Sequence, residues 1–214
     1  MILQSLTVGP FQENCYIIGD PATREGAVID PGDEAPRIIK AMENTGLRFK
    51  YIINTHAHID HVGAVQSVKD HFAIPFYLHR DDEVILRHMP QSAAMFGLKV
   101  GRVPDIEFYF NPPADMRLGD LSFKIFHAPG HSPGSVCFYF AMQHILIAGD
   151  VLFNGSIGRT DLPGGDFDTL INSIRQNIFT LPEETTVYPG HGPETTVGFE
   201  KKFNPFFDHN GLMA

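Results

Sequence analysis

Three histidines and an aspartate are crowded into positions 56–61 of the chain, which read HAHIDH. Imidazole and carboxylate groups together suit a transition metal such as zinc, iron or manganese. Three more residues of the same chemistry stand apart downstream, at His131, Asp150 and His191. A catalytic ion keeps one coordination position open for water, so seven candidate ligands are too many for one ion. The set therefore predicts a site for two metal ions.

The candidates divide between the two ions. Two ions a few ångströms apart can share a hydroxide at neutral pH, because metals lower the pKa of bound water. We expect two ligand groups and one bridging carboxylate, composed of His56, His58 and His131 for one ion, Asp60, His61 and His191 for the other, and Asp150 between them.

Each candidate follows a segment with the pattern of a strand. The run FKYIINT at 49–55 fits a strand buried on both faces, and HAHIDH forms a turn between it and a helix that begins near Val62. His131 follows an expected strand at 121–127, Asp150 ends one at 144–150, and His191 follows one at 185–190. Open α/β sheets usually place their sites at such carboxyl ends.

The remaining pattern alternates strands with helices, which predicts an α/β architecture with helix-covered sheets in one domain, 1–214. Positions 91–116 carry three prolines and little periodicity, so we expect a loop or lid there. The other strands are expected at 2–8, 15–19, 26–30, 74–79 and 135–140, and the helices at 33–46, 62–72, 80–88 and 166–181.

Composition narrows the class of protein. The formal net charge of -9 without blocks of like charge argues against nucleic acid and anionic membranes as partners. The N-terminal apolar runs are interrupted at Pro10 and again at 12–14, below signal-peptide or transmembrane length, so we expect a cytoplasmic protein. Cys15 and Cys137 are expected to be buried, reduced thiols. The last three phenylalanines, Phe203, Phe206 and Phe207, are expected to pack against the domain rather than form a dimer contact.

Four motifs, THAHIDH, APGHSPGSV, IAGDVLF and YPGHG, resemble in this order the metal motifs of the metallo-β-lactamase superfamily. The resemblance implies a four-layer αβ/βα sandwich with two metal sites at one edge. FQENCYII and GDVLFNGSIGRTDLPGGD are most similar to short glyoxalase II-like proteins, the hydroxyacylglutathione hydrolases. That likeness implies two divalent ions, zinc foremost with iron or manganese as alternatives, and a small-molecule thioester such as S-lactoylglutathione. A metal-bridging hydroxide would attack the thioester carbonyl, with Asp60 as a ligand that also orients the hydroxide.

Two departures from longer glyoxalase II enzymes concern the substrate. Only 23 residues follow His191, so we expect the helical domain that helps those enzymes bind glutathione to be absent. Where they carry a lysine and a tyrosine, this chain has Arg159 and Pro193. Arg159 could bind a glycine carboxylate in a bidentate manner or form a structural salt bridge. Glutathione as the thiol carrier therefore stays open, as does the oligomeric state.

Two alternatives remain. The segment GRTD at 158–161 also resembles the persulfide dioxygenases of the same superfamily, which hold one iron through residues matching His56, His131 and Asp150. Those enzymes continue with Phe-Gln, whereas this chain continues LPGG. A non-catalytic metal-binding module is a further, weaker alternative, since a binding role would not require a pair of ions that carries hydroxide. The isolated histidines are expected to lie outside the site: His71, His79, His88, His144 and His209.

Overall fold

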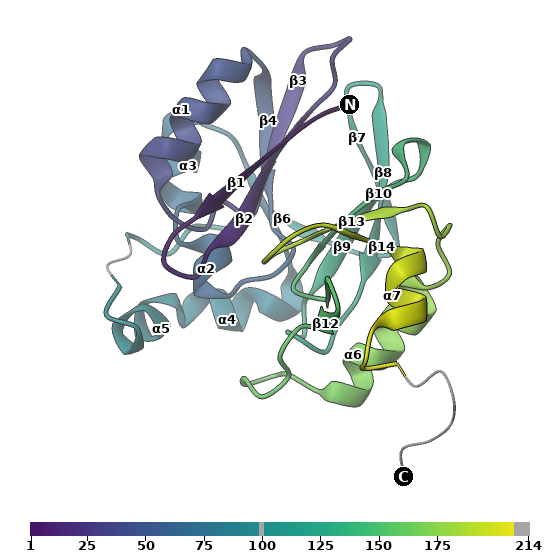
Figure 1. Cartoon of the computed structure of the whole chain (residues 1–214). Coiled ribbons are helices and arrows are strands. Elements are labelled where there is room, and N and C mark those ends of the chain that lie inside the picture. Colours follow the sequence, from purple (N-terminus) through teal and green to yellow (C-terminus); the bar gives the residue numbers. More distant parts are fainter. Residues whose placement is uncertain (99–100, 208–214) are drawn as a thin grey trace.

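Two six-stranded sheets face each other in the computed structural model, and helices cover the outer face of each sheet (Figure 1). The structure describes residues 1–98 and 101–207, so His209 lies outside the described residues. The four layers agree with the αβ/βα sandwich that the motifs imply, and the predicted fold class is confirmed. Within the described ranges, no helix has both the length and the apolar character needed to cross a membrane.

The first sheet is mixed, in the order β1-β2-β3-β4-β5-β6. Neighbours from β1 to β3 are antiparallel, and those from β3 to β6 are parallel. β2 has a core on both faces, because Cys15 and Ile17 pack under the helices while Tyr16 and Ile18 face the other sheet. This burial explains its apolar sequence. The strands are β1 (Ile2–Val8), β2 (Glu13–Gly19), β3 (Glu25–Ile29), β4 (Arg48–Ile53), β5 (Phe76–His79) and β6 (Phe108–Phe110).

The second sheet has the order β14-β13-β10-β9-β8-β7. Only β10 and β13 are parallel neighbours. Phe123, Ile125 and Phe138 point into the central core between the sheets, whereas Cys137 packs on the helix side. The strands are β7 (Ala114–Leu118), β8 (Leu121–His127), β9 (Val136–Phe140), β10 (Ile145–Gly149), β13 (Thr186–Pro189) and β14 (Thr195–Thr196), and a separate ribbon joins β11 (Leu152–Phe153) to β12 (Ser156–Ile157).

The helices bury one face each. In α1, Ile38 and Met42 lie one turn apart and are fully buried, and Gly46 ends the helix with φ 62°, a left-handed conformation that glycine adopts without strain. On the other side of the molecule, Leu170 of α6 and Val197 of α7 pack against the second sheet. The helical elements are α1 (Ala35–Thr45), α2 (Ile59–Val62), α3 (Val65–Phe72), η1 (Arg80–Asp82), α4 (Glu83–Arg87), α5 (Met89–Met95), η2 (Ala141–Gln143), α6 (Phe167–Ser173), η3 (Ile174–Ile178) and α7 (Val197–Phe203).

Strand direction brings the predicted ligands to one edge. In the first sheet, β3, β4 and β5 are parallel. In the second sheet, β8 and β10 both run antiparallel to β9, and β13 is parallel to β10, so these three strands also share one direction. The two sheets touch there, because the Val136 amide donates to the Thr55 carbonyl oxygen at 2.8 Å. The carboxyl ends of six strands from two sheets therefore meet at one place.

Two expectations from the sequence are wrong, and a third, the packing of the C-terminal phenylalanines, is confirmed only in part. Positions 91–116 do not form a continuous loop, since α5, β6 and the start of β7 fall there. The expected helix at 62–72 is two helices separated by Gly63 and Ala64. In the tail, only Phe207 packs into the core, against Phe179 at 4.6 Å between ring centroids, whereas Phe203 and Phe206 are exposed. Both cysteines are buried and unpaired, as predicted.

Candidate metal centre

Buried polar side chains shape the turn between β4 and α2. The Thr55 amide and hydroxyl donate to the two carboxylate oxygens of Asp30 at 2.7 and 2.6 Å. The Asn54 side-chain amide donates to the His61 carbonyl oxygen at 2.7 Å. α2 begins one residue before Asp60, so Asp60 and His61 lie in its first turn and not on the preceding loop as predicted. The turn thus directs side chains from both a loop and a helix toward the edge.

Three imidazoles, from His56, His58 and His131, form the first predicted group. The Nε2 atom of His131 lies 2.9 Å from His58 Nδ1 and 3.2 Å from His56 Nε2. Burial, together with the neighbouring histidines, lowers the pKa of His56 well below its usual value and that of His58 to about 4. Both rings are therefore neutral at pH 7 and offer lone pairs that point toward one place.

Asp60, His61 and His191 form the second predicted group. One ligand atom from each lies within 4.8 Å of the others, and the Asp60 carboxylate is 3.2 Å from His191 Nε2. Burial favours protonation of Asp60, but the hydrogen bond with His191 and the charges of His61 and His191 together outweigh burial and lower the pKa of the carboxyl. Asp60 is therefore a carboxylate at neutral pH.

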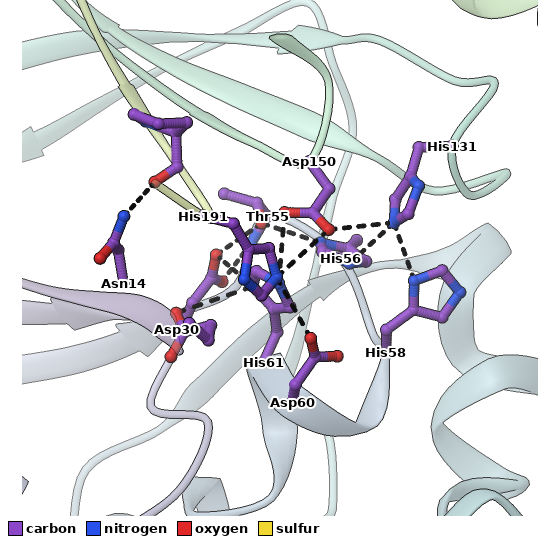
Figure 2. A network of polar contacts seen from close by, with 12 residues as sticks. Asn14, Asp30, Thr55, His56, His58, Asp60, His61, His131, Asp150 and His191 are labelled. Atoms are coloured by element: carbon purple, nitrogen blue, oxygen red, sulfur yellow. Dashed lines mark hydrogen bonds and ion pairs between the residues drawn. The ribbon is translucent and has the colours of Figure 1, made fainter. Parts of the chain in front are cut away.

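Asp150 lies between the two groups (Figure 2). Its Oδ1 is 3.4 Å from His61 Nε2, and its Oδ2 is 3.5 Å from His131 Nε2 and 3.6 Å from His191 Nε2. One carboxylate thus approaches ring nitrogens of both groups, which is the arrangement a bridging ligand requires.

The donor set fits a pair of metal ions. His61 Nε2 and Asp150 Oδ1 are buried and have no hydrogen-bond partner among the described residues, although nearly all buried polar atoms in proteins are paired. A tetrahedral ion with bonds of about 2.1 Å separates its ligand atoms by about 3.4 Å. The nitrogen–oxygen distances around Asp150 match that spacing and exceed those of ordinary hydrogen bonds.

Hydrogen bonds from the Nδ1 atoms fix the orientation of three of the candidate ligand rings. His61 Nδ1 donates to Asp30 at 3.1 Å, His131 Nδ1 to the Arg159 carbonyl oxygen at 2.8 Å, and His191 Nδ1 to the Phe11 carbonyl oxygen at 3.1 Å. With the proton on Nδ1, the Nε2 lone pair of each ring is left for a metal. Sequence reasoning missed these partners. Asp30 could have been noticed as a carboxylate at the end of the strand-like run GAVID, whereas backbone carbonyl groups leave no pattern in a sequence.

The loop that carries His191 is held by the opposite sheet. The Asn14 side-chain amide donates to the carbonyl oxygens of Pro189 and Gly192, at 3.2 and 2.9 Å. A Cβ atom on Gly190 would lie 2.1 Å from the Asp150 carboxylate, closer than real contacts allow. The glycine before His191 therefore permits the close approach of this loop to Asp150.

The predicted substrate contact makes a local ion pair. The Arg159 guanidinium donates to both carboxylate oxygens of Asp161, at 2.8 and 2.7 Å, and both side chains are exposed. A surface hollow beside Asp60 is lined by apolar side chains, including Phe11, Ile59 and Leu98, and also by the carboxylates of Asp33 and Asp60. None of the described residues that line it is a lysine or an arginine.

A further cluster with ligand atoms within 4.8 Å of one another lies apart from these groups and comprises His79, Asp81 and His127. The imidazole rings of His79 and His127 are stacked, with centroids 4.3 Å apart and planes 14° apart. In-plane lone pairs of parallel rings do not converge, so this geometry does not suit one shared ion. The other isolated histidines of the described part make separate contacts, such as His71 with Glu43.

Comparison with known proteins identifies the family. The family model of the metallo-beta-lactamase superfamily matches residues 8–191. Over 215 residues the chain is 39% identical to the hydroxyacylglutathione hydrolase GloC of Haemophilus influenzae, and the match covers 97% of this chain and 99% of that protein.

Solved structures agree with this match. A B3 metallo-beta-lactamase named BLEG-1 superposes with a TM-score of 0.89 at 40% identity, covering 96% of this chain and 99% of the other. TTHA1623 in a di-iron-bound form gives 0.88 at 40% identity, covering 95% and 100%. ETHE1 from Myxococcus xanthus gives 0.79 at 27% identity, covering 96% and 84%. The chain belongs to the metallo-beta-lactamase superfamily of metal-dependent hydrolases, and its length is that of the short GloC-type relatives.

Proposed function

We propose that this protein hydrolyses thioesters, with S-lactoylglutathione or a related hydroxyacyl thioester as substrate, at a centre for two divalent metal ions. The observation that carries the proposal is the position of the Asp150 carboxylate, within 3.6 Å of ring nitrogens from both groups. The likeness to GloC over almost the whole length of both chains supports the thioester as substrate class.

Seven residues would hold the ions in this proposal. His56, His58 and His131 hold one ion, Asp60, His61 and His191 the other, and Asp150 belongs to both. When bound, the ions would lower the pKa of water and polarise the thioester carbonyl. Zinc is our first choice, with iron or manganese possible because the same nitrogen and oxygen ligands accept all three. The di-iron form of TTHA1623 supports keeping iron in that set.

Asp60 is the residue we propose to act on the nucleophile. Its side chain is 18% exposed, whereas that of Asp150 is 10% exposed, so Asp60 lies nearer the solvent side of the centre. As a carboxylate it can accept a hydrogen bond from the attacking water and orient it toward the carbonyl carbon. In the overall reaction a C–O bond forms, the C–S bond breaks, and the sulfur leaves as a thiol after taking a proton from solvent.

The residues around the proposed centre do not require one particular thiol carrier. Glutathione carries two carboxylates, and the nearby Arg159 already pairs with Asp161. The apolar side chains in the hollow beside Asp60 offer contacts to an uncharged part of a substrate. We propose that Arg159 binds a carrier carboxylate only by exchanging its partner, so that carriers without carboxylates are also accepted.

A thioester panel tests the proposal. Protein purified without added metal is analysed for metal content, reconstituted with zinc, iron or manganese, and assayed for release of free thiol. S-lactoylglutathione, acyl thioesters of uncharged thiols and a β-lactam form the panel, the last because BLEG-1 is 40% identical. We expect thioester cleavage. If metal-replete protein leaves every thioester intact, the proposed function is wrong.

An iron-dependent persulfide dioxygenase is the second candidate. His131 Nε2 lies 3.2 Å from His56 Nε2 and 3.5 Å from the Asp150 carboxylate, so the three residues expected to hold a single iron do meet. The likeness to ETHE1 favours it, although at a lower identity than GloC. Oxygen uptake with glutathione persulfide, together with one iron per chain, would support this candidate over hydrolysis.

A further inference from the structure

Asp82 is a buried carboxylate next to the proposed centre that belongs to neither ligand group. It ends η1, the turn after β5, and its side chain is fully buried. Its Oδ2 accepts hydrogen bonds from the Ala57 amide and the Ser132 hydroxyl, each at 2.8 Å, and its Oδ1 accepts one from the Gly134 amide at 2.6 Å. No lysine, arginine or histidine pairs with it within 4.0 Å in the described part of the chain.

The partners of Asp82 come from the two segments that carry the first ligand group. Ala57 lies between His56 and His58, and Ser132 follows His131. These segments belong to different sheets, so their relative position is not set by strand pairing. The fit around the carboxylate is tight, because a Cβ atom on Gly134 would lie 2.7 Å from Asp82 Oδ1.

A second buried carboxylate lies on the other side of the centre. Asp30 binds the Thr55 amide and hydroxyl and His61 Nδ1, and it makes no hydrogen bond to the segment around His131 in the described structure. Asp30 thus supports His61 and, through the Thr55 hydroxyl at 3.1 Å from His56 Nδ1, one ring of the first group. Of the two carboxylates, Asp82 is the one that joins this turn to the segment around His131. We propose that Asp82 is a positioning residue that fixes the His56, His58 and His131 group, and with it the affinity of that group for metal. This inference rests on the metal centre proposed above.

The substitution Asp82→Asn tests the inference with little change in volume. The asparagine oxygen can still accept hydrogen bonds, but its NH2 group would face one of the amide donors and leave that donor unpaired. Metal-free protein is titrated with cobalt(II), and the absorption of the bound ion reports each equivalent. We expect the wild type to bind two equivalents, and Asp82→Asn to bind one of them about 10- to 100-fold more weakly, as is typical when a group that orients ligands is lost.

Two backgrounds assign the affected ion. In His191→Ala protein the ion that remains well held is at the first group, and adding Asp82→Asn should weaken it. In His58→Ala protein the remaining ion is at the second group, and Asp82→Asn should change its affinity by less than threefold. Asp81→Asn is the matched control, since this neighbour is 56% exposed. It also reports any cobalt held by the cluster of His79, Asp81 and His127.

The outcomes separate the inference from the proposed metal centre. If wild-type protein does not bind two equivalents, the metal centre itself is wrong. If it does, equal weakening of both ions by Asp82→Asn, or no weakening of either, overturns the positioning role, because a purely structural residue would not distinguish them. Should Asp82→Asn fail to fold, Ser132→Ala removes a single hydrogen bond from the same carboxylate. A weaker, still selective loss is then expected, and its absence contradicts the role.

Discussion

Asp150 is the residue through which the two halves of the centre meet. Burial disfavours its charge, but His61, with smaller contributions from His131 and His191, outweighs burial and lowers the pKa of the carboxyl. The carboxylate is therefore ionised at neutral pH even though it is buried. A neutral amide of the same shape would keep the packing and remove the charge.

Asp150→Asn is therefore expected to retain the fold and to lose one of the two metal ions. Loss of a group that only orients a ligand costs about 10- to 100-fold, so loss of a bridging ligand should reduce thioester cleavage by about 100-fold or more. Metal analysis and the thioester assay measure both effects. Asp168→Asn, an exposed carboxylate of α6, is the control and should retain both ions. An Asp150→Asn protein with two ions and wild-type cleavage would remove Asp150 from the centre.

Gly190→Ala probes the close approach at the same residue. The added methyl group would lie 2.1 Å from Asp150 Oδ1 and 2.7 Å from the His61 ring. We expect metal content to fall by one ion per chain. Gly192→Ala is a useful comparison because its methyl group meets nothing within 4 Å, although φ is +75°. That substitution should cost about 1–2 kcal/mol of unfolding free energy without changing metal content. Equal metal content in both variants would contradict the steric argument.

At the scale of elements, strand ends could be predicted from the sequence, and local turns between them could not. FKYIINT and HILIAGD are apolar runs that stop abruptly at polar residues, so the strands before His56 and at Asp150 were placed correctly. β6 is only three residues long and pairs with β5 alone, so it exists through a partner distant in sequence. The prolines nearby suggested a loop instead.

The metal centre also combines features that could be predicted from the sequence with features that could not. The seven candidate ligands were identified from residue type and spacing, and the structure brings all of them to one edge. The start of α2 was missed because His58, its N-cap, makes no side-chain capping bond, so the usual helix signal is absent. Asp82 follows a strand that does not carry a ligand, and its role depends on contacts between sheets. No local pattern reveals such contacts.

A turn outside the metal centre connects the two sheets by hydrogen bonds. Asp20, after β2, accepts hydrogen bonds from the Asp120 amide at 2.8 Å and the Thr23 hydroxyl at 2.7 Å. These bonds, the Asp120 amide first, lower the pKa of Asp20 to about 2. A lowered pKa means that the carboxylate contributes stability above its ordinary pKa of about 3.8 and loses it as the pH falls toward 2.

The free energy of unfolding should therefore differ between wild type and Asp20→Asn by a constant amount above about pH 4. The difference should shrink between about pH 4 and about pH 2, because both proteins then carry an uncharged group. Denaturant unfolding at a series of pH values measures it. Asp115→Asn, an exposed carboxylate on β7, provides the comparison. A difference that does not change with pH would contradict the role of the ionised carboxylate.

At the scale of the whole molecule, the centre joins two sheets that each supply ligands. His56, His58, Asp60 and His61 follow the first sheet, and His131, Asp150 and His191 follow the second. Ions bound between them would hold the sheets together. An ion at 100 times its dissociation constant adds about 2.7 kcal/mol of stability. Removal of metal by a chelator should therefore lower Tm by about 5–10 °C per ion. An unchanged Tm in scanning calorimetry would contradict binding at this junction.

The most direct test of the central claim is a titration of metal-free protein with zinc, iron or manganese during thioester cleavage. Each addition is followed by measurement of free thiol released from S-lactoylglutathione and from an acyl thioester of an uncharged thiol. If two ions act together at Asp150, cleavage should rise with added metal and reach its maximum at two equivalents per chain. Cleavage that is absent at every ratio, or that is complete at one equivalent, would contradict the account.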